Sequence, residues 1–344
     1  MKTIARLAGV SRMTVSRALR NDPLLSGGTV RKIHEIAGNL GYRPDPRVSE
    51  LMSHLRRTRC NRINETIAHV RVVDTGDANP DADLSSSRVM NGAARAANQA
   101  GYRFERLSWR IDQCDARRMA GILHARGIRG VVIHNQVRGF SLGGICDHLA
   151  CAVVGIPPLK CCVHRTGPNH HLTIEIAMEK LGQSGYRRVG LFLSATASSH
   201  TEHIWHCAFL THQFEQDMLA PERACVAEHP DANHFRRWFA SVRPDAVVTD
   251  RQEVLTWLAD LGAEVPVKVG FVQLDWSTAI GPCAGVDQRL EEVGAVALDF
   301  VHRQLMDNHI GPPDYPLIAL TNVVWVDGDS IRPPVEATLS LQPA

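Results

Sequence analysis

Residues 3–19 read TIARLAGVSRMTVSRAL, and this stretch decides the architecture of the N-terminal end of the chain. Ala5 is small where a second helix must cross closely, and Gly9 suits a tight turn between two short helices. Ser11 is a suitable N-cap for the second helix, because its side chain can accept a hydrogen bond from a free backbone N–H group. The spacing therefore predicts a helix-turn-helix.

The second helix of this motif has a polar outer face. Arg12, Met13 and Arg17 can point away from the small apolar core to which Val15 and Leu19 contribute. An arginine can bind the O6 and N7 atoms of guanine through two hydrogen bonds. Such a face is what a helix that enters the major groove of DNA requires.

Charge is distributed unevenly along the 344 residues. Residues 1–62 contain 13 Lys and Arg against 4 Asp and Glu, a balance of +9, and the remainder has 25 against 32, a balance of −7. This asymmetry indicates an anionic polymer as the partner of the N-terminal end.

The opening stretch resembles the lactose repressor and galactose repressor (LacI/GalR) family, whose members commonly begin D-V-A-x-x-A-G-V-S-x-x-T-V-S-R-x-L-N. A third helix is expected from about residue 26 to 39, and it is followed by the family's L-G-Y-x-P as LGYRP at 40–44. The resemblance implies that Arg12, Met13 and Arg17 contact bases. It also implies contacts to the DNA backbone from Ser11, Thr14, Ser16, Asn21, Ser26 and Thr29.

Two departures from the family concern the ends of the DNA-binding part. Residues 44–62 are expected to be a hinge helix and linker, but they lack the family's P-N-x-x-A-R-x-L. Leu51 matches the leucine that enters the minor groove, whereas Glu50 is unfavourable beside phosphates, so Leu55 remains a rival. The family also has a few more residues before the first alanine, so the true start could lie upstream.

Beyond residue 63, short apolar runs alternate with helical stretches, which is typical of parallel α/β sheets. The alternation begins again near residue 174, and this predicts two similar doubly wound lobes. The expected strands are 67–73, 131–134, 152–156, 189–193, 246–249 and 267–274, with β structure again at 316–326; the expected helices are 89–100, 174–183, 205–216, 254–261 and 291–306.

The resemblance extends through this region, in LGQSGYRRVGL at 181–191, VGFVQLDW at 269–276 and GVDQ at 285–288. It implies a sensor of two lobes like those of periplasmic binding proteins, with an effector bound between them. The expected domains are a helix-turn-helix head (1–43), the hinge (44–62), an N-lobe (63–156 and 287–313), a C-lobe (157–286 and 314–335) and a tail (336–344).

Candidate effector residues follow from strand ends and from the resemblance. Asp275 is expected to accept hydrogen bonds from ligand hydroxyls, and Trp276 to stack on an apolar ligand face. Thr249 and Asp250 occupy the position of the family's Asn-Asp, while His203 and Trp205 stand where the family often has an arginine. The family's Asp-Asn at the entrance of the second lobe is replaced by Gly167-Pro168-Asn169-His170. A sugar or related metabolite is the implied effector, with its identity and the sign of its action left open.

Other functions have less support. An enzyme would need a nucleophile with its base or a phosphate-binding loop, and a solute-binding protein would need a signal sequence; neither pattern is present. His200, His203, His206, Cys207 and His212 suggest a metal site, because helical spacing puts the first three near one face. Neutral polar lining of a pocket is favoured over this, so no cofactor or metal is expected. The predicted protein is a cytoplasmic regulator, with repression the commoner mode in the family, that binds a pseudo-palindromic operator as a homodimer. A tetramer remains open, although the tail has no heptad series.

Overall fold

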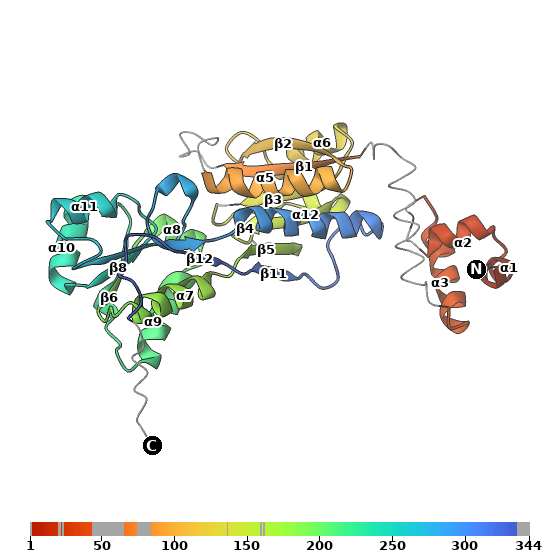
Figure 1. Cartoon of the computed structure of the whole chain (residues 1–344). Helices are drawn as coiled ribbons and strands as arrows, with labels where there is room; N and C mark the ends of the chain where they lie inside the picture. The colour runs from red at the N-terminus through yellow and green to blue at the C-terminus, as the bar shows by residue number, and fades with distance from the viewer. Residues whose placement is uncertain are drawn as a thin grey trace, which may run out of the picture. The chain divides into compact units, whose positions relative to one another are not determined.

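The structure is a computed structural model that describes residues 2–19, 22, 24–42, 65–73, 84–135, 137–158, 160 and 162–335. The chain folds into two compact units (Figure 1). Unit 1 comprises Met1–Thr166 and Glu291–Ala319, and unit 2 comprises Gly167–Leu290 and Leu320–Ala344.

The head is a three-helix domain, as the sequence predicted. Its helices are α1 (Lys2–Ala8), α2 (Arg12–Ala18) and α3 (Gly27–Asn39). Ile4, Val15 and Ile33, one from each helix, are fully buried together and form the centre of a small core. Gly9 has a φ of +71°, a conformation that favours glycine, and so allows the tight turn between α1 and α2.

The sensor part of unit 1 is built on a six-stranded sheet with the strand order β11-β5-β4-β3-β1-β2. Neighbouring strands from β2 through β1, β3 and β4 to β5 are parallel to each other. The direction in which strands are added to the sheet reverses between β1 and β3. The strands are β1 (Thr66–Val73), β2 (Arg103–Arg110), β3 (Ile128–Asn135), β4 (Ala150–Gly155), β5 (His164–Pro168) and β11 (Ile318–Thr321); the helices are α5 (Leu84–Gln99), α6 (Ala116–Ala125) and α12 (Leu290–Met306).

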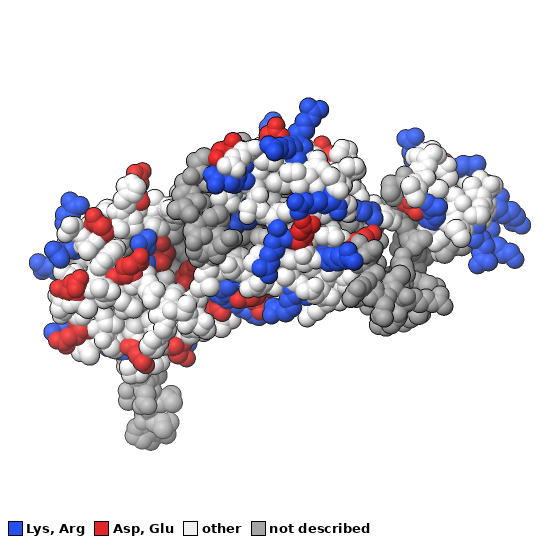
Figure 2. Space-filling model, turned by 90° about the horizontal axis from the view of Figure 1, so that it is seen from above, with Lys and Arg blue, Asp and Glu red and all other residues white. Residues whose placement is uncertain are grey.

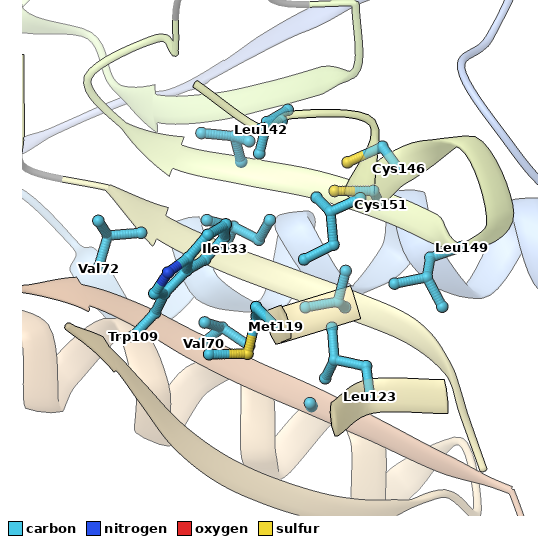
Figure 3. Packing of buried hydrophobic residues seen from close by; sticks show 14 of the residues in the cluster. Val70, Val72, Trp109, Met119, Leu123, Ile133, Leu142, Cys146, Leu149 and Cys151 are labelled. Atoms are coloured by element: carbon cyan, nitrogen blue, oxygen red, sulfur yellow. The ribbon is translucent and has the colours of Figure 1, made fainter. Parts of the chain in front are cut away.

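Alternate residues of the strands supply the cores on the two faces of this sheet. On one face, Val70 and Ile133 pack against Met119 and Leu123 of α6, with Trp109 in the same cluster (Figure 3). On the other face, Gly130 leaves room for Val301 of α12, whose Cγ1 would lie 2.6 Å from a Cβ at that glycine. Helices on both faces are what a doubly wound parallel sheet requires.

Helices α5 and α12 cross at backbone contact in unit 1. A Cβ on Gly92 would lie 1.8 Å from the carbonyl oxygen of Glu291, and a Cβ on Gly294 would lie 1.9 Å from that of Val89. Beside the crossing, Arg88 donates two hydrogen bonds from Nε and Nη2 to the Glu291 carboxylate at 2.8 and 2.7 Å. Glycine at both positions therefore sets how closely the two helices approach.

Unit 2 repeats the topology of the first sheet, with the order β12-β10-β9-β8-β6-β7. Its strands are β6 (Val189–Ser194), β7 (Ala224–Ala227), β8 (Ala246–Thr249), β9 (Gly270–Gln273), β10 (Gly285–Asp287) and β12 (Val324–Val326); its helices are α7 (His170–Gln183), α8 (Ala195–His200), α9 (Ile204–Glu215), α10 (Ala232–Val242) and α11 (Val254–Asp260). The matching strand orders confirm two doubly wound lobes. No helix in the described part of the chain is long and apolar enough to cross a membrane.

The chain passes between the units at places that differ from those expected. The first crossing falls after Thr166 rather than after residue 156, because β5 pairs with β4 and so belongs to the first sheet. The return to unit 1 ends at Ala319 rather than at residue 313, because the Arg165 N–H donates to the carbonyl of Leu317 just before β11. Strand β5 (HRTGP) lacks the continuous apolar run that marks a central strand, so the sequence contained no sign of it.

The helix crossing predicts opposite effects of one substitution at two glycines. Gly92→Ala forces a methyl group into the backbone of Glu291, so we expect a loss of about 3 kcal/mol in the free energy of unfolding of unit 1. Gly121→Ala on α6 meets no atom within 4 Å, so we expect a gain of about 0.5–1 kcal/mol from the better helix former. Urea unfolding followed by circular dichroism measures both, and equal effects would contradict the close crossing.

Candidate functional site

Helix α2 presents the three side chains expected to contact bases. Met13 is 72% exposed, Arg12 is exposed, and the Arg17 side chain is 33% exposed. Val15 and Ala18, on the opposite side, are buried in the head core. The outer face of α2 is therefore available to a partner.

Helices α2 and α3 begin with the same capping arrangement. The Ser11 hydroxyl accepts a hydrogen bond from the Thr14 N–H at 3.0 Å and lies 2.9 Å from the Thr14 hydroxyl. Ser26 and Thr29 repeat this with distances of 3.3 and 2.8 Å. Each pair fixes the start of its helix, where polar groups and free N–H groups suit phosphate oxygens.

Arg17 is held by a carboxylate that sequence reasoning did not single out. Its Nε donates to Asp22 Oδ2 at 2.7 Å, and the ion pair raises the pKa of Arg17 above its ordinary value. Asp22 lies in the connection between α2 and α3, five residues after Arg17. The i, i+5 spacing across a helix end is not a standard sequence signal, which is why the pair was missed.

Lys and Arg predominate on the face of the head that Figure 2 shows. The exposed basic residues of the head include Lys2, Arg6 and Arg12 of the first two helices and Arg31 and Lys32 of α3, and Glu35 is an exposed acid. Three of the predicted contact residues, Asn21 in the backbone set and Leu51 and Leu55 in the hinge, lie outside the described residues.

In unit 2 the strand order reverses between β6 and β8, and their carboxyl ends are tied together. Asp250, directly after β8, accepts hydrogen bonds from the N–H and hydroxyl of Ser194 at 2.9 and 2.6 Å. Burial raises the pKa of Asp250 even though these hydrogen bonds favour its charged form. Thr249, fully buried, accepts from the Arg251 N–H at 3.0 Å. Both predicted residues thus lie at the carboxyl end of β8, beside the reversal of strand order, which is the place where doubly wound sheets bind ligands.

The two residues after β9 are placed differently from each other. The Trp276 indole packs against the cluster around Phe271 and donates from Nε1 to the Cys283 carbonyl at 3.0 Å. Its ring is therefore part of the core of unit 2. Asp275 is partly buried one residue beyond Leu274, at the carboxyl end of β9.

Trp205 and His170 meet at the N-terminal ends of α9 and α7. Trp205 is 4% exposed, and its ring packs edge-on against His170 with a centroid distance of 5.5 Å. The Nε1 atom of Trp205 and the Nδ1 atom of His170 are both buried without a hydrogen-bond partner. Burial lowers the pKa of His170 to about 4, so its imidazole is neutral near pH 7.

Further polar groups surround the same ends of the helices and strands. Thr173, one turn after His170, donates to Gln288 Oε1 at 3.2 Å, and Gln288 Nε2 donates to the Leu274 carbonyl at 2.5 Å. Gln273, at the end of β9, donates from Nε2 to the Asp250 carbonyl, and its Oε1 is buried without a partner. His203 begins α9 in a left-handed conformation, with Nδ1 2.9 Å from the Ser198 hydroxyl.

The structure thus brings His203 and Trp205 to the start of one helix and adds His170, Gln273 and Gln288, which were not among the predicted effector residues. The one sequence signal for His170 is that residues 167–170 depart from the family's Asp-Asn at the entrance of the second lobe. Among the described residues, no group of three or more His, Cys, Asp or Glu is placed to hold a metal ion.

Comparison with known sequences gives a family for the head. Residues 1–45 match the model of "Bacterial regulatory proteins, lacI family". The HTH-type transcriptional regulator PtxS of Pseudomonas plecoglossicida is 27% identical over 188 residues, which are 54% of this chain and 51% of that protein. The probable HTH-type transcriptional repressor ExuR of Bacillus subtilis (strain 168) is 47% identical over 51 residues, 15% of either chain. The match to PtxS thus spans about half the length of that relative.

Solved structures with the same fold cover nearly the whole chain. The transcriptional regulator CelR in complex with cellobiose has a TM-score of 0.63 at 20% identity, covering 95% of this chain and 98% of its own. The lac repressor dimer bound to operator and the anti-inducer ONPF has a TM-score of 0.60 at 15% identity, covering 96% and 98%. The head therefore matches the lacI family of bacterial regulatory proteins over residues 1–45, and the chain as a whole shares the fold of these solved structures.

Proposed function

We propose that this protein is a sequence-specific DNA-binding transcriptional regulator, with repression as its expected action, whose affinity for an operator is controlled by a small-molecule effector. The observation that carries the proposal is helix α2, which presents Arg12, Met13 and Arg17 on the outer face of a basic head. Arginine fits the major-groove edge of guanine, and a helix-turn-helix positions its second helix there. The proposal assigns the chain no catalytic step.

A homodimer is the form in which such a head binds a DNA operator. One recognition helix contacts only a few base pairs, whereas two related by a two-fold axis read a pseudo-palindromic site. The lac repressor structure with the same fold is a dimer on its operator. The hydroxyl pairs at the starts of α2 and α3, together with Ser16 and Asn21, are assigned to backbone contacts, and a hinge leucine, Leu51 or Leu55, to the minor groove.

The effector is assigned to the carboxyl ends of the strands in unit 2. An indole N–H can only donate a hydrogen bond, whereas a neutral imidazole nitrogen donates or accepts according to its tautomer. A hydroxyl group both accepts and donates, so one hydroxyl could satisfy Trp205 Nε1 and His170 Nδ1 together. Asp275 would accept from another hydroxyl, while Thr249, Asp250, His203 and Trp276 support the surrounding crevice. A sugar or another hydroxylated metabolite has this chemistry.

The DNA assignment predicts that two head variants fail in different ways. Arg17→Ala removes a bidentate base contact, so we expect a loss of about 1–3 kcal/mol of discrimination at one base pair of each half-site. Thr29→Ala removes a hydroxyl assigned to the backbone, so we expect binding to weaken by the same factor on every sequence. Selection from random duplexes with the full chain gives the operator, and titration of single-base variants gives both effects. Equal loss on all sequences for both variants would contradict the division of roles.

The effector assignment predicts opposite effects on ligand binding and on the ligand-free protein. Trp205→Phe and His170→Phe remove polar atoms that lack partners, so the ligand-free protein should keep or gain stability while affinity for the effector falls by about tenfold or more. A thermal-shift screen of sugars, nucleosides and small acids identifies the ligand, and operator titration shows its effect. Asp275→Ala should also weaken the response of operator binding to the ligand.

The control is Trp238→Phe, which removes an indole N–H in the other core of unit 2 and should leave ligand binding unchanged. Unchanged affinity in both ring variants would exclude this subsite.

His170 also predicts a pH dependence of stability. Its pKa is about 4 in the folded protein, against an ordinary value of 6.5. Between these values the unfolded chain binds more protons than the folded one, so the free energy of unfolding falls as the pH falls, by up to about 1.4 kcal/mol per pH unit. We expect His170→Phe to lose this contribution when urea unfolding is compared at pH 7 and pH 5. Buried His69, with a pKa of about 3, contributes equally in both proteins. The same fall in the variant would show that His170 is not the group concerned.

A further inference from the structure

Hydrogen bonds of its backbone and of its carboxylate hold Asp22 in the connection between α2 and α3. Its backbone N–H donates to the Arg17 carbonyl at 3.1 Å, and its Oδ1 accepts from the Leu24 N–H at 3.0 Å. Its other carboxylate oxygen, Oδ2, accepts from Arg17 Nε at 2.7 Å. The backbone bonds hold the carboxylate in place, so that Oδ2 in turn holds Arg17.

The hydrogen bond to Asp22 uses the Nε atom of the Arg17 guanidinium and not its terminal nitrogens. A guanidinium has five donors in a planar fork, and a contact at Nε leaves the terminal nitrogens to act as a pair. Guanine presents O6 and N7 to the major groove at a spacing that such a pair can bind. Holding the side chain before DNA arrives also removes part of the entropy that a long flexible side chain would otherwise lose on binding.

A turn residue alone would not need the second carboxylate oxygen. The Leu24 N–H in the turn donates to Oδ1, and asparagine supplies that atom equally well. A negative charge near DNA also opposes binding, because it is repelled by the phosphates. Asp22 is one of only 4 acidic residues among the 62 at the basic end of the chain. The negative charge of Asp22 therefore lowers affinity for DNA in general, and the compensating benefit that we identify is the orientation of Arg17.

We propose that Asp22 is a positioning residue for base recognition, which orients Arg17 so that its terminal nitrogens bind the major-groove edge of a guanine in each half-site. This inference rests on the proposed function. Asp22 acts through Arg17 and makes no base contact of its own. It therefore increases the preference for one base pair at the expense of affinity for DNA in general.

The test separates preference from affinity with charge-matched variants of the full chain. The operator is selected from random duplexes with the wild type, and Arg17→Ala identifies the base pair that Arg17 reads. For Asp22→Asn, which keeps Oδ1, we expect preference at that base pair to fall by about tenfold. Preference at other positions should hold, and binding to random DNA should strengthen. Glu35→Gln makes the same charge change at an exposed site on α3, so it should strengthen random binding without changing preference.

A double variant shows whether Asp22 acts through Arg17. In the Arg17→Ala background, Asp22→Asn should cause no further change in preference. A further loss there would overturn the inference, as would an unchanged preference in Asp22→Asn alone or an equal loss at all positions. Asp22→Ser, which also keeps a side-chain acceptor, replaces Asp22→Asn if thermal unfolding shows that the head is damaged. If the wild type selects no sequence, the proposed function itself is refuted. If the wild type selects a clear operator and Asp22→Asn has the same base preference as the wild type, only this inference is refuted.

Discussion

The backbone contact between α5 and α12 is the constraint on which unit 1 depends. Helix α12 reaches this unit only after the chain has built most of unit 2, so its packing must be specific enough to bring back a segment 203 residues distant from its partner. Gly92 and Gly294 allow the two helix backbones to approach closely. Arg88 and Glu291 form a charged hydrogen bond beside the crossing that fits only one alignment of the helices. This bond lowers the pKa of the Glu291 carboxyl. A salt bridge alone would add little, because its two side chains are partly exposed. The glycines determine the geometry, and the ion pair selects the register.

Unit 2 retains polar atoms that a purely structural core would have lost. A buried polar atom without a hydrogen bond costs about 1–3 kcal/mol, and Trp205 Nε1, His170 Nδ1 and Gln273 Oε1 are three such atoms at the ends of neighbouring elements. Phenylalanine or leucine at the first two positions would avoid this cost. A ligand that satisfies these atoms recovers the lost free energy only when it binds. Under the proposed function, an effector hydroxyl would supply the missing hydrogen bonds, and it would act as a switch if it did so in one conformation and not in the other.

The sequence predicted the central apolar strands and five of the sensor helices, but not α6, α8 or α10, although α6 and α10 have buried apolar residues at helical spacing. The run AVVT at β8 is fully buried and was predicted with its observed bounds, and the five predicted helices begin and end within five residues of the observed bounds. Strand β2 (RFERLSWR) lies at a sheet edge with mostly exposed or partly exposed side chains, so it has no apolar run to detect. The same reason hid β5, and the expected crossing at residue 156 followed from that omission. In the effector region, strand ends located Thr249 and Asp250, but pairings such as Asp250 with Ser194 depend on tertiary packing that periodicity does not encode.

Under the proposed function, affinity for DNA and specificity for one sequence are assigned to different atoms of the head. The hydroxyl pairs at Ser11 and Ser26 fix the starts of two helices, and the surrounding lysines and arginines attract any DNA. Those features alone would give a protein that binds all sequences with similar strength. Discrimination requires that a side chain be correctly oriented for one base and unable to adapt to the others. A flexible arginine adapts, because its long stem can follow whichever acceptor is near. An arginine whose Nε is held by a fixed carboxylate has less freedom to do so, and the 2.7 Å contact between Arg17 and Asp22 imposes this restraint within the protein, before DNA is bound.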